Sequence, residues 1–150
     1  MYKIISWTAV ILWMGFIFHL SHQPATVSNE LSTGVTEVIV RTVERVAPNR
    51  EFDIKRFNHI IRKNAHFFIY LVLGVFVINA FRASGVYGYR GMALALLVCV
   101  LYAISDEVHQ MFIPGRGPGV KDVLIDSAGA TVGIGVYMFV VKMLMIRGIL

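Results

Sequence analysis

Four polar side chains near the end of an apolar run combine residue types that serve both acid–base chemistry and ligand binding. Asp106 and Glu107 are adjacent, and His109 and Gln110 follow after one intervening residue. On a helix the four side chains would cover an arc of roughly 160°, because successive residues turn by about 100°. A histidine beside carboxylates can activate water or transfer a proton. Asp106 and Glu107 are therefore candidate catalytic residues as well as candidate ligand-binding residues.

A second polar group stands at the start of an earlier apolar run. His59, Lys63, His66 and Tyr70 occur at i, i+4, i+7 and i+11, which predicts a polar stripe along one face of a helix that enters the bilayer. Such a stripe must face protein or water rather than lipid. His66 is the third catalytic candidate, although a histidine at a membrane interface is more often satisfied by a backbone carbonyl.

Arg116 lies in a turn rich in glycine and proline, residues 114–119, that precedes two aspartates. This composition predicts a rigid turn that presents the arginine. The planar guanidinium group suits a phosphate or carboxylate ligand, and it could equally be the counter-ion of Asp122. Asp122 and Asp126 are one helical turn apart; Asp122 could simply cap the fourth span, and Asp126 could be a first-turn acid that faces the helix dipole. Both aspartates are therefore candidate ligand-binding residues, and a purely structural role is the alternative.

The composition predicts that these groups act in a membrane. Of 150 residues, 57% are hydrophobic and 15% are charged, and the mean hydropathy is +0.68, whereas soluble domains have about a quarter charged residues. The length predicts a single domain, residues 1–150. The net charge of +5 would suit lipid or nucleic acid, but no basic soluble segment with interspersed aromatic residues is present, so no nucleic-acid partner is expected. Cys99 is the single cysteine, which excludes an internal disulfide.

Four apolar runs predict four membrane spans, at residues 4–20, 65–81, 92–104 and 123–146. A span needs about 20 residues, so the third run must continue through residues 105–112 and carry its two acids to membrane depth. The first run could be the core of a signal peptide. It contains Trp7 and Trp13 and lacks small residues at the cleavage positions, so a retained anchor helix is expected.

Two further patterns complete the predicted fold. Five aliphatic residues and Thr42 recur at i, i+3, i+4, i+7, i+8 and i+11 within residues 35–46, the period of a helix that lies in the membrane interface. In the fourth run, Gly129 and Gly133 have the spacing that lets another helix approach closely. The prediction is an all-α membrane protein: a four-transmembrane-helix bundle with an interfacial amphipathic helix in the first long loop.

The charge distribution gives conflicting evidence on orientation. Four spans place both termini on one side of the membrane and the first and third connections on the other. The connection side carries nine of the 14 basic residues, which by count favours a cytoplasmic location for that side. However, no Lys or Arg occurs from residue 4 to residue 40, and all nine acids lie on the connection side. We expect cytoplasmic termini and an extracytoplasmic polar side in the cell membrane.

Four motifs are shared with a known family. They are Ser21-x-Gln23, Lys63-x-x-His66-Phe67-x-x-Tyr70, Asp106-Glu107-x-His109-Gln110-x-Phe112-x-Pro114-Gly115-Arg116 and Asp122-x-x-x-Asp126-x-x-Gly129. Through them the chain resembles the VanZ-like membrane proteins, over residues 4–140. The resemblance implies a bacterial inner-membrane protein and, for the founding members, low-level resistance to the glycopeptide teicoplanin. Family members often carry an acid just before the equivalent of Tyr70, where this chain has Ile69, so any role of that acid is missing here.

Three classes of function are compatible with these residues. The preferred one is a membrane-surface pocket that binds an anionic or amphiphilic cell-envelope molecule, such as a lipid-linked precursor. The second is a membrane-embedded enzyme that uses a histidine–carboxylate site, with or without a metal ion, although the His-Glu-x-x-His signature and a hydroxyl nucleophile flanked by a base are both missing. The third is a structural ion network whose function lies in partner contacts.

The candidate ligand-binding residues are Gln23, Lys63, His66, Asp106, Glu107, His109, Gln110, Arg116, Asp122 and Asp126. No residue is assigned as a metal ligand, the cofactor is left open, and membrane lipids are the expected partners. Burying two adjacent carboxylates would cost at least ~2.5 kcal/mol each. We therefore expect Asp106 and Glu107 to converge with His66 and Arg116 in one pocket, roofed by the helix at 35–46. His19 and His22 are expected to be merely interfacial.

Overall fold

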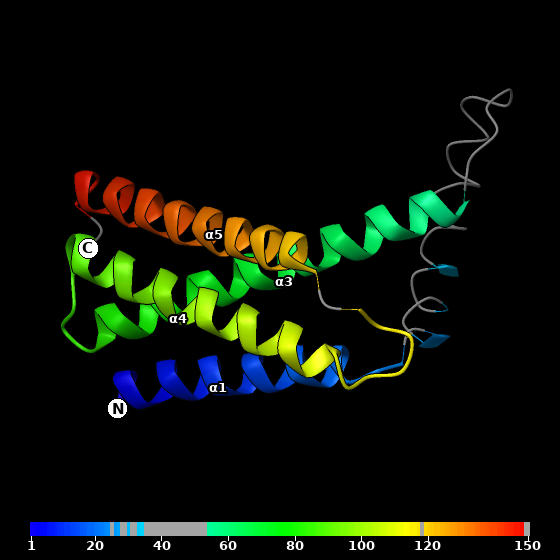
Figure 1. The fold of residues 1–150 in the computed structure, drawn as a ribbon. Coiled ribbons are helices and arrows are strands. Elements are labelled where there is room, and N and C mark those ends of the chain that lie inside the picture. The colour runs from blue at the N-terminus through cyan, green and yellow to red at the C-terminus, as the bar shows by residue number, and fades with distance from the viewer. Residues whose placement is uncertain (25, 28–29, 31–32, 35–53, 118, 149–150) are drawn as a thin grey trace, which may run out of the picture.

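The computed structural model describes residues 1–24, 26–27, 30, 33–34, 54–117 and 119–148, with the backbone alone for 54–59 and 62. Its long helices are α1 (Tyr2–Ser21), α3 (Ile54–Ala83), α4 (Gly88–Gln110) and α5 (Val120–Ile146) (Figure 1). No strand occurs in these residues. The predicted interfacial helix at 35–46 lies outside the described residues and stays a prediction.

Each long helix contains a segment long and apolar enough to cross a membrane. These segments have 20, 21, 23 and 27 residues, and about 20 residues are needed to cross the hydrocarbon layer. The expectation of four spans is confirmed, and the chain is an all-α, multi-pass membrane protein. The third span runs to Gln110, so its extension beyond the apolar run is confirmed, although the helix ends two residues before the predicted residue 112. Asp106 and Glu107 belong to its last turns.

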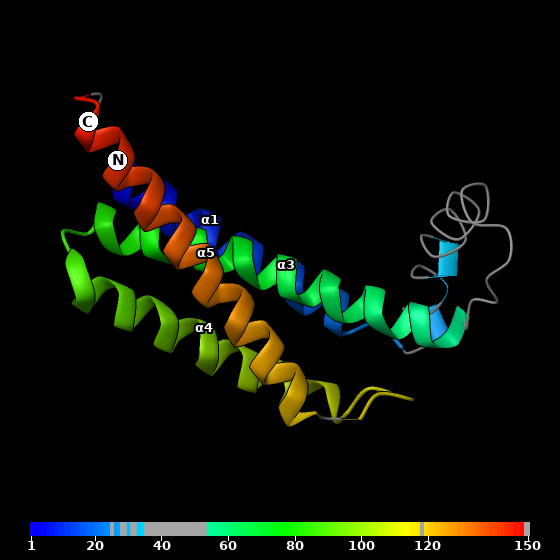
Figure 2. The same cartoon turned by 90° about the horizontal axis from the view of Figure 1, so that it is seen from above.

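The direction of the four helices alternates, which gives the bundle two chemically different ends. Both termini lie at one end, together with the turn between α3 and α4 (Figures 1 and 2). The end of α1, the end of α4 and the start of α5 lie at the opposite end. We call these the terminal end and the motif end. The topology thus brings the acids of α4 and α5 to the same end of the bundle.

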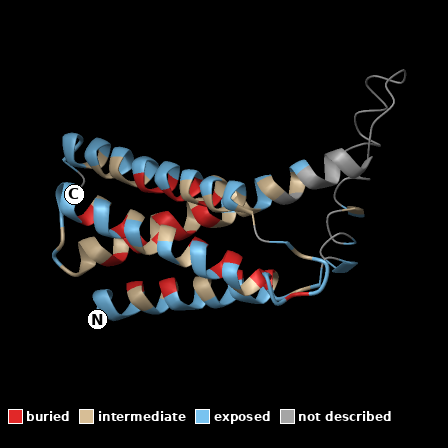
Figure 3. Cartoon of the chain, in the orientation of Figure 1, coloured by how far each residue is buried: buried red, intermediate tan, exposed pale blue. Residues whose placement is uncertain are grey.

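Glycines let α5 pack directly on the backbone of α3. A Cβ atom added to Gly129 would overlap the backbone oxygen of Phe67, and one added to Gly133 would overlap that of Leu71. The predicted close approach is therefore confirmed, and the neighbouring helix is α3. Buried residues follow the inward faces of the helices along this contact (Figure 3). Close packing and dispersion replace the hydrophobic effect as the source of helix association in lipid, so these glycines fix how α5 lies against α3.

Asn79 joins three helices towards the terminal end. Its amide oxygen accepts hydrogen bonds from the hydroxyl groups of Tyr2 and Tyr137, both at 2.9 Å, and its amide nitrogen donates to Ser6 Oγ at 3.2 Å. Hydrogen bonds of this kind link helices in a bilayer. The sequence analysis missed this group, because Asn79 is a lone polar residue in an apolar run. Both ends of the bundle are thus held by polar contacts, while the acidic side chains of the four described long helices all lie at the motif end.

Candidate functional site

Asp106 connects α4 to α1 at the motif end. Its side chain is 3% exposed, and Oδ2 accepts hydrogen bonds from Ser21 Oγ at 2.8 Å and from Gln110 Nε2 at 3.2 Å. Its Oδ1 is buried and has no hydrogen-bond partner among the described residues. Ser21 is itself fully buried at the end of α1. Asp106 therefore links α4 to the end of α1.

Glu107 holds the start of α5. Its Oε2 accepts a hydrogen bond from the backbone N–H of Gly119 at 2.8 Å, and Gly119 is the N-cap residue of α5. A carboxylate at this position satisfies an N–H group that has no partner within the helix and interacts favourably with the helix dipole. The contact spans the connection between α4 and α5. The Glu107 carboxylate thus fixes the distance between these two helices at the motif end.

Two ion pairs connect α3 to α5 one turn apart. Lys63 Nζ lies 2.9 Å from Asp122 Oδ1, with 27% and 35% of the side chains exposed, and His66 Nδ1 lies 3.8 Å from Asp126 Oδ1. The second distance is too long for a hydrogen bond. Asp126 is fully buried, and neither of its carboxylate oxygens has a hydrogen-bond partner in the described part of the chain. Buried polar atoms are normally hydrogen-bonded, so Asp126 offers two acceptor atoms to a water molecule or a ligand.

Arg116 reaches from the α4–α5 connection to the end of α1. Its Nη2 donates a hydrogen bond to the backbone oxygen of Leu20 at 3.3 Å. The connection itself turns tightly: the N–H of Arg116 donates to the oxygen of Ile113 at 3.1 Å, and Gly115 has φ +77°, a conformation that favours glycine. This geometry agrees with the predicted turn, and it directs the half-buried guanidinium group towards the centre of the motif end.

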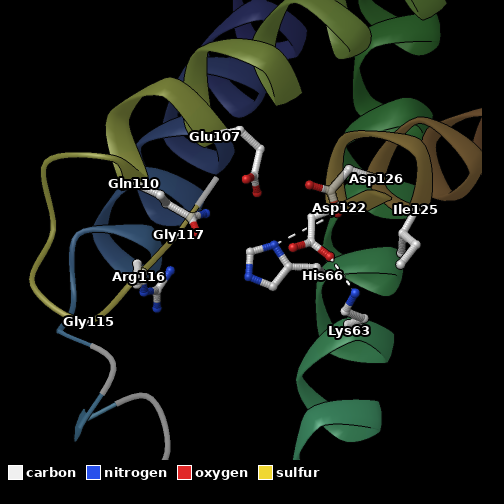
Figure 4. A pocket seen from close by; sticks show the side chains of 10 residues that line it. All are labelled: Lys63, His66, Glu107, Gln110, Gly115, Arg116, Gly117, Asp122, Ile125 and Asp126. Carbon is white, nitrogen blue, oxygen red and sulfur yellow. Dashed lines mark ion pairs between the residues drawn. The ribbon is translucent and has the colours of Figure 1, made fainter. Parts of the chain in front are cut away.

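These side chains enclose a cavity of about 80 Å³. It is lined by Lys63, His66, Glu107, Gln110, Gly115, Arg116, Gly117, Asp122, Ile125 and Asp126 (Figure 4). In Figure 4, Lys63 and His66 project from α3 beside the two aspartates of α5, while Arg116 lies across the cavity from Asp126. One water molecule needs roughly 10–15 Å³ of such volume. The cavity therefore has room for several waters or for one small polar group.

The structure places seven of the ten candidate ligand-binding residues on the wall of this cavity. The remaining three are Asp106, Gln23 and His109, and none of them lines it. His66 and Glu107 are the catalytic candidates that do line it, and Arg116 joins them. The structure thus brings His66, Glu107 and Arg116 to one cavity, whereas Asp106 is bonded to Ser21 of α1. Ile125 also lines the cavity and was not predicted, because its side chain has no group that could bind an ion or react.

His109 belongs to an aromatic group beside the cavity. Its Nε2 lies 3.1 Å from His22 Nδ1, and its ring lies 4.4 Å from the ring of Phe18. His22 is exposed and His109 is half-buried. In the described residues, no group of three or more His, Cys, Asp or Glu side chains is arranged to hold a metal ion.

The fold and the site define a multi-pass membrane protein with a small charged cavity at one end of a four-helix bundle. A family model described as VanZ/LLP1 matches residues 6–142, and the chain belongs to this family. The resemblance seen in the motifs is therefore confirmed over nearly the whole chain. Searches of curated proteins and of solved structures each found no match.

Proposed function

We propose that this protein binds the polar head group of an amphiphilic cell-envelope molecule in the cavity at the motif end. Arg116, Lys63 and His66 contact the anionic part of the head group, while Glu107, Gln110 and Asp106 hold the cavity together. The observation that carries the proposal is the position of three basic side chains around a cavity at the end of four membrane spans. A molecule whose apolar part stays in the bilayer would reach this cavity with its head group.

The chemistry of Arg116 supports an anionic group as the ligand. A guanidinium group has five N–H donors in a fixed plane, and Arg116 uses Nη2 to bond the Leu20 oxygen at the edge of the cavity that it lines. Its planar fork matches phosphate and carboxylate oxygens better than a lysine does. The cavity volume of about 80 Å³ suits a head group and excludes an acyl chain. The proposed ligand is therefore held by its charge and anchored by the surrounding lipid.

Retention of lipid during purification tests this function. We expect the wild-type protein, extracted gently and analysed by native mass spectrometry, to retain a phosphate-bearing amphiphile. Arg116→Ala should reduce retention at least about tenfold, the loss typical of a charge-assisted hydrogen bond to a ligand. Arg90→Ala removes the same charge at the terminal end and should leave retention unchanged. Equal retention by Arg116→Ala and wild type would contradict the proposal.

The proposed orientation places the motif end outside the cytoplasm and both termini inside it. Single cysteines introduced by Val40→Cys, Gly117→Cys or Tyr89→Cys would report this orientation. The Cys99→Ser background removes the single native cysteine, which is buried. We expect an impermeant maleimide to label positions 40 and 117 in intact cells and position 89 only after permeabilisation. Labelling of 40 and 117 from opposite faces would contradict the four-span topology. Labelling of position 89 alone in intact cells would reverse the orientation.

A second candidate function is catalysis by His66 and Asp126. Asp126 Oδ1 lies 3.8 Å from His66 Nδ1, and the imidazole ring projects into the cavity (Figure 4). A histidine beside a carboxylate can act as a general base towards water. His66→Gln separates this candidate from binding alone. An enzyme would accumulate unconverted amphiphile in this variant, whereas a binding protein would show the same lipid species in both forms.

A further inference from the structure

Asp126 is the feature of the cavity that an anionic ligand alone does not explain. Its carboxylate is fully buried, both oxygens have no hydrogen-bond partner among the described residues, and it lines the cavity. Figure 4 shows it opposite Arg116. A buried carboxylate without hydrogen-bond donors is strongly destabilising. A ligand that donates hydrogen bonds would satisfy both oxygens at once.

The charges of the cavity wall favour a ligand with a positive group. The wall contains three carboxylates, of Glu107, Asp122 and Asp126, and two permanently cationic groups, of Lys63 and Arg116. Its third basic side chain, His66, is charged only when it is protonated. A plain anion would therefore enter a site that already has more carboxylates than permanent cations. Lys63 also lies against Asp122, and Glu107 is bonded to the Gly119 N–H. His66 Nδ1 lies 3.8 Å from Asp126 Oδ1, too far for a hydrogen bond. Among the described residues, Asp126 is therefore the wall carboxylate with no hydrogen-bond donor on either oxygen.

We propose that the head group is zwitterionic, with its phosphate at Arg116 and a primary ammonium group at Asp126. This inference rests on the proposed function and names the chemical class of its ligand, a phosphate ester of an amino alcohol. A primary ammonium group supplies three N–H donors, enough for both Asp126 oxygens. A quaternary ammonium group has the same charge and no donor. Because neither Asp126 oxygen has a hydrogen-bond partner among the described residues, the site should bind a primary ammonium group more tightly than a quaternary one.

Competition between phospholipids that differ only in the head group tests this inference. The full-length protein in detergent is mixed with equimolar phosphatidylethanolamine, phosphatidylcholine and phosphatidylglycerol of identical acyl chains, and bound lipid is counted by native mass spectrometry. We expect phosphatidylethanolamine to be bound at least about tenfold more than phosphatidylcholine, because one charged hydrogen-bond pair accounts for a factor of this size. Asp126→Asn should reduce this preference to near unity while phosphate-dependent binding persists, and Arg90→Ala should keep the wild-type preference.

The outcomes separate the two proposals. Equal binding of the ethanolamine and choline lipids by the wild-type protein overturns the inference even if Asp126→Asn fails to fold, and so does a preference for phosphatidylglycerol over both. In either case the proposed function stands as long as Arg116→Ala loses the bound lipid. If Arg116→Ala binds all three lipids as the wild type does, the proposed function itself is wrong. A preference for the ethanolamine lipid that Asp126→Asn retains also overturns the inference, because the ammonium group would then bind elsewhere.

Discussion

Gly133→Leu should lower the thermal stability of the protein in detergent more than any substitution on the lipid-facing side of α5. A Cβ atom at this position would already overlap the backbone oxygen of Leu71, and a backbone atom in a helix cannot move aside cheaply. Overpacking of this kind typically costs about 1–3 kcal/mol, and a leucine adds further atoms to the same contact. The loss is expected as a lower melting temperature by circular dichroism, together with aggregation on size-exclusion chromatography.

Gly135→Leu is the matched control for this prediction. It makes the same change two residues later on α5, where an added Cβ atom would have no neighbour within 4 Å, so its melting temperature should stay close to that of the wild type. If Gly133→Leu and Gly135→Leu melt alike, the α3–α5 contact is not where the structure places it.

Alanine at Arg116 or Glu107 should abolish the phenotype that the protein confers, while expression and membrane insertion persist. If the protein gives glycopeptide tolerance, the measurement is the minimal inhibitory concentration of teicoplanin in a sensitive host, with protein levels checked by immunoblot. Arg116→Ala removes the planar donor group of the cavity. Glu107→Ala removes the acceptor that holds the Gly119 N–H and the start of α5. Arg90→Ala, at the terminal end, should have little effect.

Charge-conserving variants distinguish a binding geometry from a structural ion network. Arg116→Lys keeps the charge and loses the planar fork, and Glu107→Asp keeps the carboxylate one methylene further from the Gly119 N–H. A structural network should tolerate both changes, whereas a geometric site should lose most of its function with either. Normal function of both alanine variants would contradict a ligand site and would favour the structural interpretation, in which the charges only hold the helices together.

Much of the fold follows from patterns that one helix carries by itself. The length needed to cross a bilayer predicted that the third span had to include Asp106 and Glu107, and α4 does extend to Gln110. The spacing of Gly129 and Gly133 predicted a close helix contact, because a missing side chain is visible in the sequence. These predictions needed only the geometry of a single helix.

Contacts between helices could not be predicted from the sequence in the same way. Adjacent carboxylates point about 100° apart on a helix, but the rotation of α4 decides which one faces the cavity. The structure turns Asp106 towards Ser21 and leaves Glu107 at the cavity. The choice of Lys63 as the neighbour of Asp122 likewise depends on how α3 and α5 pack. Asn79 was missed for the same reason, since its partners come from two other helices.

A structure of the protein determined in its native lipids would show directly whether the cavity binds a head group. We expect density for a phosphate or other anionic group within about 3 Å of the Arg116 guanidinium nitrogens, the distance of a hydrogen bond, with an attached apolar chain that leads into the bilayer. Density for water alone in the cavity, at a resolution that defines lipids elsewhere around the bundle, would contradict the proposed binding.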